Sequence, residues 1–143
     1  MPTRVVLDTN VCLDLFVFHD PRWVELLAAL NDGRLEAVTR ADCRTEWRLV
    51  LHYPKLPLDE VTRAAAAAEF DRLIRCIEPE LDGVPVPLPL CSDGDDQKFL
   101  ELARDSGASI LITKDKALLK LARRTAKSGL FRIVAPQGWA AVG

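Results

Sequence analysis

The sequence predicts one α/β domain with helices on both faces of a central parallel sheet. Short apolar runs rich in valine and isoleucine, typical of buried strands, alternate with longer segments of helical periodicity. This alternation favours parallel strands joined by crossover helices. Asp8 and Asp115 lie at or just past the ends of two such runs. Because sites form at the carboxyl edge of open parallel sheets, we expect these two carboxylates to be neighbours.

Short apolar runs give the predicted strands. The first begins at Arg4, contains two valines and ends before Asp8, and the third ends at Thr113. Both are too short for buried helices, so a strand is favoured. The predicted strands are residues 4–7, 35–39, 109–113 and 131–135.

Capping and breaking residues place the predicted helices between these strands. Gly33 closes the second helix, Pro54 ends the third, Asp59 is the expected N-cap of the fourth, and Gly107 stops the fifth. The predicted helices are residues 10–18, 23–31, 41–53, 58–77, 93–106 and 117–127. A connection with four prolines and a glycine, residues 79–89, is predicted to be extended. It is too short to separate two cores, so residues 1–143 are predicted to form a single domain.

Composition narrows the class of protein. The chain is 49% hydrophobic and 28% charged, as expected for a soluble globular domain. No apolar run approaches the roughly 20 residues that span a bilayer. The first residues lack the apolar stretch of a signal peptide, so we expect a cytoplasmic protein. The four cysteines are widely spaced and form no C-x-x-C pair, which argues against a zinc site.

Four acidic residues occupy positions that suit a metal site. Asp8 and Asp115 follow predicted strands, and Glu46 and Asp96 interrupt the apolar stripes of predicted helices. Glu46 precedes Leu49, Val50 and Tyr53 at helical spacing, and Asp96 precedes Phe99, Leu100 and Ala103 in the same way. Such stripes normally face the core, where an unpaired carboxylate is costly. We therefore expect the four acids to converge at one edge of the sheet.

Clustered carboxylates need a counter-charge. They repel one another and take up protons unless a cation neutralises them. Mg²⁺ and Mn²⁺ prefer carboxylate oxygens and water, and a bound ion can activate water and stabilise charge on a phosphodiester. Asp93, one turn before Asp96, is a lesser candidate ligand.

Each acid also has a purely structural interpretation. Asp8 can cap the following helix, and Asp93, Asp95 and Asp96 open a helix, where the macrodipole favours acids. Asp115 can be a turn residue. These interpretations stay open for each residue singly, and the conjunction of the four favours a metal site.

Charge is distributed unevenly along the chain. The net charge is −2, yet residues 114–132 contain seven basic residues and one acid. A basic stretch beside an acidic cluster suits a polyanion held by one patch while a metal held by the other acts on it. A solvated helix face is the alternative. The candidate RNA-binding residues are Lys114, Lys116, Lys120, Arg123 and Arg124.

Four motifs in order resemble the PIN domain family, and within it the bacterial VapC-like toxin ribonucleases. The motifs are L-D-T-N-V at residues 7–11, E-W-R-L-V-L-H-Y-P-K-L at 46–56, D-G-D-D-Q-K-F-L-E-L-A at 93–103 and I-L-I-T-K-D-K-A-L-L at 110–119. Each motif alone is weak, but together they cover nearly the whole chain.

The resemblance implies a three-layer α/β/α PIN-like fold with a central parallel sheet. It implies an acidic pocket that binds Mg²⁺ or Mn²⁺, single-stranded RNA endonuclease activity and, for toxins, an antitoxin partner. By position, the family's acids correspond to Asp8, Glu46, Asp96 and Asp115, and Asn10 and Thr113 correspond to polar pocket residues. This chain departs from the pattern at Gly94, where proline is usual, and at Ala117, where a further acid is common. The second departure favours one catalytic metal.

Other functions remain open from the sequence. A PIN-fold binding or assembly module with little nuclease activity would share the same fold. A haloacid-dehalogenase-like phosphatase also has an aspartate after its first strand, but it needs a second aspartate where Asn10 stands. A receiver-like signalling domain would lack the helix-borne Glu46.

The family resemblance and an apolar helix face near the N-terminus together suggest a homodimer that also binds an antitoxin segment. Trp23, Leu26, Leu27 and Leu30 share one face of the second predicted helix, and Trp47 lies beside Glu46. Packing inside the core is the alternative for both.

Overall fold

Five parallel strands form one sheet at the centre of the computed structural model, which describes residues 2–81 and 83–142. The strand order is β3-β2-β1-β4-β5. The strands are β1 (Thr3–Leu7), β2 (Leu35–Thr39), β3 (Ile74–Cys76), β4 (Ile110–Ile112) and β5 (Arg132–Val134). Because β1 is central and pairs with both β2 and β4, the residues that follow β1 and β4 meet at one edge of the sheet.

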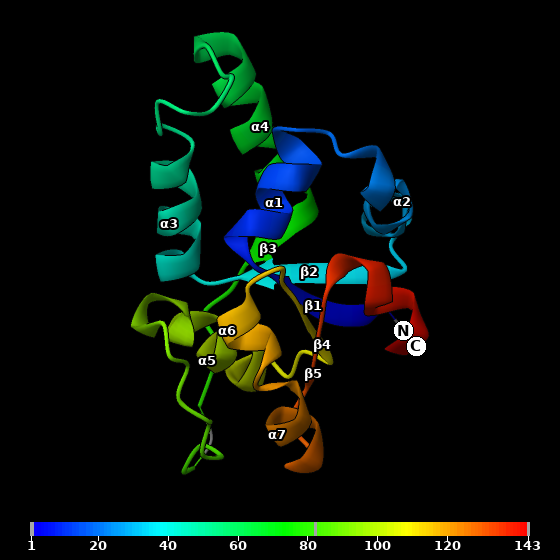
Figure 1. Ribbon diagram of the computed structural model, residues 1–143, viewed down its shortest axis with the longest axis vertical. Helices are drawn as coiled ribbons and strands as arrows, with labels where there is room; N and C mark the ends of the chain where they lie inside the picture. Colours follow the sequence, from blue (N-terminus) through cyan, green and yellow to red (C-terminus); the bar gives the residue numbers. More distant parts are fainter. Residues whose placement is uncertain (1, 82, 143) are drawn as a thin grey trace.

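Helices cover both faces of the sheet, which gives the predicted three-layer α/β/α fold (Figure 1). Helices α1, α2 and α4 lie on one side, and α5, α6 and α7 lie on the other. The α-helices are α1 (Thr9–Phe16), α2 (Val24–Asp32), α3 (Ala41–Val50), α4 (Glu60–Leu73), α5 (Gln97–Asp105), α6 (Lys116–Leu119) and α7 (Ala122–Lys127). Three short 3-10 helices are η1 (Pro21–Trp23), η2 (Gly94–Asp96) and η3 (Pro136–Val142).

Alternate residues of each strand supply two separate cores. Val5 and Leu7 of β1 pack with α1, α2 and α4, whereas Val6 packs with α5 and α6. This period of two is what a sheet covered on both faces requires. Both cores lie directly beneath the carboxyl ends of β1 and β4, and they hold those ends in place.

Three aromatic rings join α1, α3 and α4. Trp47 stacks on Phe70 with their ring centroids 5.0 Å apart, and Phe16 contacts both rings edge-on. Such pairs contribute about 0.5–1.5 kcal/mol each beyond their buried area. The cluster anchors α3, and therefore Glu46, to the first helix.

The last residues of one predicted helix form a strand instead. Residues 58–77 were expected to be helical throughout, but α4 ends at Leu73 and residues 74–76 form β3. Ile74 turns into the extended conformation and pairs with Ala37. The strand has only three residues, which is too few to show an alternating pattern, and no glycine or proline separates it from the helix. The sequence therefore does not indicate where the helix ends and the strand begins. The predicted cap is confirmed: Asp59 and Thr62 form a capping box.

Two other predicted helices are interrupted. Residues 93–106 divide into the 3-10 turn η2 and helix α5, which places Asp96 at the junction. Residues 117–127 divide into α6 and α7. The division occurs where the Leu121 N–H donates to the carbonyl of Leu118, a tighter turn that brings both leucines into the core.

The prediction that Glu46 lies on a core-facing stripe is wrong. Leu49 and Tyr53 are 63% and 57% exposed. The buried positions are instead Cys43, Trp47 and Leu51, spaced four residues apart. Glu46 therefore lies at the boundary between core and solvent. The corresponding stripe of Asp96 is confirmed, since Phe99, Leu100 and Ala103 are buried.

The predicted dimer face is part of this chain's own core. Trp23, Leu26 and Leu30 are buried, Leu27 packs against them, and Trp47 is 1% exposed. These residues therefore give no support to a homodimer. Within the described residues, no helix is both long enough and apolar enough to cross a membrane.

Candidate active site

Three carboxylates from distant parts of the sequence meet at the carboxyl edge of the sheet. Asp8 follows β1, Asp115 follows β4, and Asp96 lies where η2 passes into α5. Each offers an oxygen, and these atoms lie within 4.8 Å of one another. The central position of β1 beside β4 accounts for the meeting of Asp8 and Asp115.

Asp8 is the buried member of the group. It is 4% exposed and caps α1 by accepting a hydrogen bond from the Thr9 N–H at 2.6 Å. Its second oxygen accepts from the Thr113 hydroxyl at 2.7 Å. Burial raises the pKa of Asp8 to about 6, while the bonds from Thr113 and Thr9 oppose the rise and the nearby charges of Glu46 and Asp115 add to it. The predicted cap of α1 is confirmed, and its geometry leaves Asp8 within reach of the other two acids.

Asp96 and Asp115 behave as a proton-sharing pair. Burial raises the pKa of Asp96 to about 8, helped by a hydrogen bond with Asp115 and by the charges of Asp8, Asp115 and Asp93. The same bond lowers the pKa of Asp115, which also caps α6 through the Ala117 N–H at 2.9 Å. One proton held between two carboxyls is the expected response of crowded acids that lack a cation.

Thr113 and Asn10, the predicted polar pocket residues, form hydrogen bonds next to the acids. Thr113 is fully buried, donates to Asp8 and accepts from the Asp115 N–H at 2.9 Å. One hydroxyl therefore fixes two of the three acids. The side-chain oxygen of Asn10 accepts from the Lys114 N–H at 3.3 Å, which ties the loop after β4 to α1.

Glu46 lies beside the group of three and not within it. One oxygen accepts a hydrogen bond from the Thr9 hydroxyl, and the other pairs with the Lys98 ammonium at 2.9 Å. The charge of Glu46 still contributes to the raised pKa of Asp8. Asp93 is also outside the group and caps η2 through the Asp95 N–H at 3.1 Å, while Asp95 is exposed.

Lys98 and Asp14 are site residues that the sequence analysis missed. Burial alone would lower the pKa of Lys98, but its hydrogen bond and attraction to Glu46 raise that pKa overall. Asp14 is buried, accepts from the Trp23 indole N–H at 2.9 Å and pairs with the Lys114 ammonium at 2.8 Å. Lys98 and Glu46 are separated by 52 positions, and Asp14 and Lys114 by 100, so neither contact has a local sequence signal.

The basic segment divides into two roles. Lys114 is held by Asp14 and stabilises the loop that positions Asp115. The other four candidate RNA-binding residues are exposed and form none of the ion pairs found among the described residues. They are Lys116, Lys120, Arg123 and Arg124.

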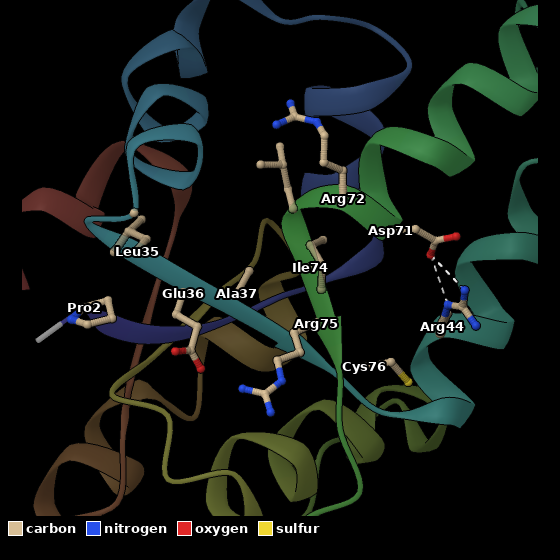
Figure 2. Close-up of a pocket in the computed structure, with 12 residues that line it drawn as sticks. Pro2, Leu35, Glu36, Ala37, Arg44, Asp71, Arg72, Ile74, Arg75 and Cys76 are labelled. Carbon is tan, nitrogen blue, oxygen red and sulfur yellow. Dashed lines mark hydrogen bonds and ion pairs between the residues drawn. The ribbon is translucent and has the colours of Figure 1, made fainter.

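A groove of about 700 Å³ lies elsewhere and is lined mainly by residues of β2 and β3 and of helices α3 and α4 (Figure 2). None of the three clustered acids lines it. Arg44 on its wall bonds to Asp71, as the dashed lines show, and Arg72 pairs with Glu69. Most of its charged residues are paired and it holds no cluster of acids, so it is a weaker candidate for chemistry than the acid cluster.

Comparison with known proteins agrees with the geometry. A family model described as PIN domain matches residues 4–117, which include Asp8, Glu46, Asp96 and Asp115. No curated protein matches the chain.

Proposed function

Because this chain belongs to the PIN domain family, we propose that it is a metal-dependent endoribonuclease that cleaves single-stranded RNA. The observation that carries the proposal is the meeting of Asp8, Asp96 and Asp115, whose oxygens lie within 4.8 Å of one another. PIN domains are usually metal-dependent nucleases, and this cluster is compatible with that chemistry.

The three acids fit a divalent cation. Mg²⁺ binds oxygen ligands at 2.0–2.1 Å in octahedral geometry, which places neighbouring ligands about 2.9 Å apart and opposite ligands about 4.2 Å apart. The three oxygens, which lie within 4.8 Å of one another, therefore need only a small inward movement to bind one ion. No lysine or arginine among the described residues forms an ion pair with Asp8, Asp96 or Asp115. An all-carboxylate set favours Mg²⁺ or Mn²⁺ over softer metals. When bound, the ion supplies an activated water and stabilises charge on the phosphodiester.

The protein's own groups prepare the site for that charge. Thr113 orients Asp8 and Asp115 through a single hydroxyl. Asp96, whose pKa is about 8, holds a proton with Asp115 at neutral pH. That proton leaves when a cation takes its place, so metal affinity rises with pH.

Exposed basic side chains that follow Asp115 in the sequence suit the phosphates of RNA. Lys116 follows Asp115 directly, and Lys120, Arg123 and Arg124 continue along α6 and α7. Such contacts hold a nucleic acid without reading its sequence. Single-stranded RNA as the substrate rests on the resemblance of the four motifs.

An RNA cleavage assay with matched variants tests the activity. Wild-type protein should cleave single-stranded RNA in Mg²⁺ or Mn²⁺ and not in EDTA, and Asp96→Asn should abolish cleavage. Asp93→Asn is the control, because it removes the same charge nearby and asparagine caps a helix equally well. Loss of activity in Asp93→Asn alone, or metal-independent cleavage, would contradict the proposed site.

Salt dependence of binding tests the RNA contacts. In Ca²⁺, chosen to slow cleavage, affinity for single strands should fall by about 0.7 in log–log slope for each phosphate neutralised. Replacing Lys120, Arg123 and Arg124 together with alanine should flatten that slope and leave metal affinity unchanged. If the plots of log affinity against log salt concentration coincide for wild type and the triple variant, RNA does not contact these three side chains.

We propose the toxin of a type II toxin–antitoxin pair as the cellular role, with an antitoxin protein and a second copy of the chain as partners. This role is supported by the motif resemblance. Induced expression should arrest growth for wild type and not for Asp96→Asn. Sedimentation at micromolar concentration distinguishes a dimer from a monomer.

A PIN-fold binding module is the second candidate. It predicts RNA or protein binding that persists in Asp96→Asn, with no metal-dependent cleavage by wild type. A phosphatase of the haloacid dehalogenase type is disfavoured, because the side chain of Asn10 receives the Lys114 N–H where that chemistry needs an acid.

A further inference from the structure

We propose that the Lys98 ammonium takes the place of a second metal ion: it neutralises Glu46 and contacts a phosphate, so that the site binds one metal per chain. This inference rests on the proposed nuclease function and names a further residue of that site. It follows from the contacts of Glu46, from the anchoring of Lys98 and from the residue at position 117.

Both carboxylate oxygens of Glu46 already have a partner in the protein. The Thr9 hydroxyl donates to one carboxylate oxygen, and the Lys98 ammonium lies 2.9 Å from the other. Glu46 accordingly stands outside the group formed by Asp8, Asp96 and Asp115. Two-metal phosphodiesterases hold their ions about 3.5–4 Å apart. Even where the two ions share a bridging carboxylate, the second ion needs further acidic ligands. Ala117 offers none.

The Lys98 ammonium is held by two acceptors of the protein and has a third N–H that can donate to a ligand. Its side chain is 19% exposed, and its ammonium lies 5.1 Å from the Phe99 ring centroid. The ammonium also donates to the backbone carbonyl of Asp95. Two of its three hydrogens are therefore committed to fixed acceptors, and the third remains for a ligand.

The location suits a scissile phosphate. Lys98 is two residues after Asp96 and bonds to Glu46, whose charge is felt by Asp8. A cation here lies on the Glu46 side of the three-acid group. A phosphate held at the group's metal would thus have positive charge on two sides, which is the arrangement that two metals provide in other nucleases.

Metal stoichiometry gives the first test, independent of activity. Titration calorimetry with Mn²⁺ should give one site per wild-type chain. Glu46→Gln should weaken that site much less than Asp96→Asn does, because Gln keeps the Thr9 contact and Glu46 is not a ligand. Two sites in wild type, or equal weakening by the two variants, would overturn the inference.

RNA affinity gives the second test. In Ca²⁺, Lys98→Met should reduce the log–log salt slope by about 0.7, the value for one phosphate contact on a single strand. Lys98→Arg should retain the slope, and exposed Lys55→Met is the matched control. A structural ion pair alone would leave the slope of Lys98→Met unchanged, which would refute the phosphate contact. If wild type neither binds nor cleaves RNA, the nuclease proposal itself fails; if it does both with an unchanged Lys98→Met slope, only this inference fails.

Discussion

At the scale of single residues, Asp8 is subject to two opposing effects. Its hydrogen bonds favour the charged carboxylate, whereas its burial favours the protonated form. It caps α1 and accepts from Thr113, yet burial raises its pKa to about 6. The charged form is therefore costly at neutral pH without a cation. A shift of two units corresponds to about 3 kcal/mol.

Asp8→Asn should therefore raise the stability of the metal-free protein at pH 8, by up to about 3 kcal/mol, while abolishing cleavage. Asparagine still caps the helix and carries no charge. Urea unfolding in EDTA measures the change. A large loss of stability in this variant would mark the charged carboxylate as structural.

The ion pair between Asp14 and Lys114 holds the loop before Asp115. Asp14→Ala should destabilise the protein by about 1–3 kcal/mol, because the buried Trp23 indole N–H loses its acceptor. Lys114→Met should cost less, about 1 kcal/mol at most, since the Lys114 side chain is 38% exposed. Thermal unfolding of the two variants tests this order.

The ion pair with Asp14 makes Lys114 different from the other basic residues of its segment, whose side chains remain available to RNA. Because its ammonium is occupied by Asp14, Lys114→Met should leave the salt slope of RNA binding unchanged. Replacement of Lys120, Arg123 and Arg124 should flatten it. A flattened slope for Lys114→Met would show that the ion pair opens to receive RNA.

At the scale of elements, the 3-10 turn that carries Asp96 begins with a glycine where proline is usual in similar sequences. A Cβ at Gly94 would meet no atom within 4 Å. Asp93 has φ −97° and ψ 108°, the extended conformation that a following proline requires. Gly94 is also the first residue of η2, a position that proline favours.

Gly94→Pro should therefore stabilise the protein by about 0.4–1 kcal/mol, by restricting the unfolded chain. Mn²⁺ affinity should be retained or raised, because the start of α5 becomes more rigid. Denaturant unfolding and Mn²⁺ titration measure the two effects. Gly83→Pro is an unsuitable control because φ there is +72°; Gly94→Ala is the appropriate intermediate.

At the scale of the whole molecule, the acid cluster sets the pH dependence of stability. The pKa values of Asp8 and Asp96, about 6 and about 8, lie above the value near 3.9 of an unfolded aspartate. Between about pH 4 and pH 8 the folded state therefore binds more protons than the unfolded state. Its stability should fall as pH rises through this window.

Unfolding free energies in EDTA at pH 5, 6.5 and 8 should show this fall for wild type and a flatter profile for Asp96→Asn. Mg²⁺ should counteract the fall, contributing about 2.7 kcal/mol at a hundredfold excess over its Kd. A wild-type stability that rises over this range would mean that the acids are neutralised by other groups.

The sequence predicts those features that depend on local pattern. Periodicity places four of the five strands, and the apolar runs before Asp8 and Asp115 put those acids at the same sheet edge. The motif containing Asp96 lies on a stripe that is buried as expected. Each of these signals is contained within about ten neighbouring residues.

Features that depend on contacts between distant segments could not be predicted from the sequence. The apolar residues after Glu46 indicate a buried stripe, yet the aromatic cluster of Trp47, Phe16 and Phe70 turns the helix so that Leu49 and Tyr53 face solvent. The ion pair of Lys98 with Glu46 depends on that rotation. Among the described residues, β3 pairs with β2 alone, so its formation depends on a segment more than 30 positions earlier.

The strand order also bears on when the acid cluster can form during synthesis. β1 precedes its pairing partner β4, and the acid that follows β4, by about 100 residues of sequence. A nascent chain that ends before Asp96 carries only one of the three clustered acids. The three acids therefore come together only after most of the domain has left the ribosome, and a fragment that ends before Asp96 lacks the complete cluster.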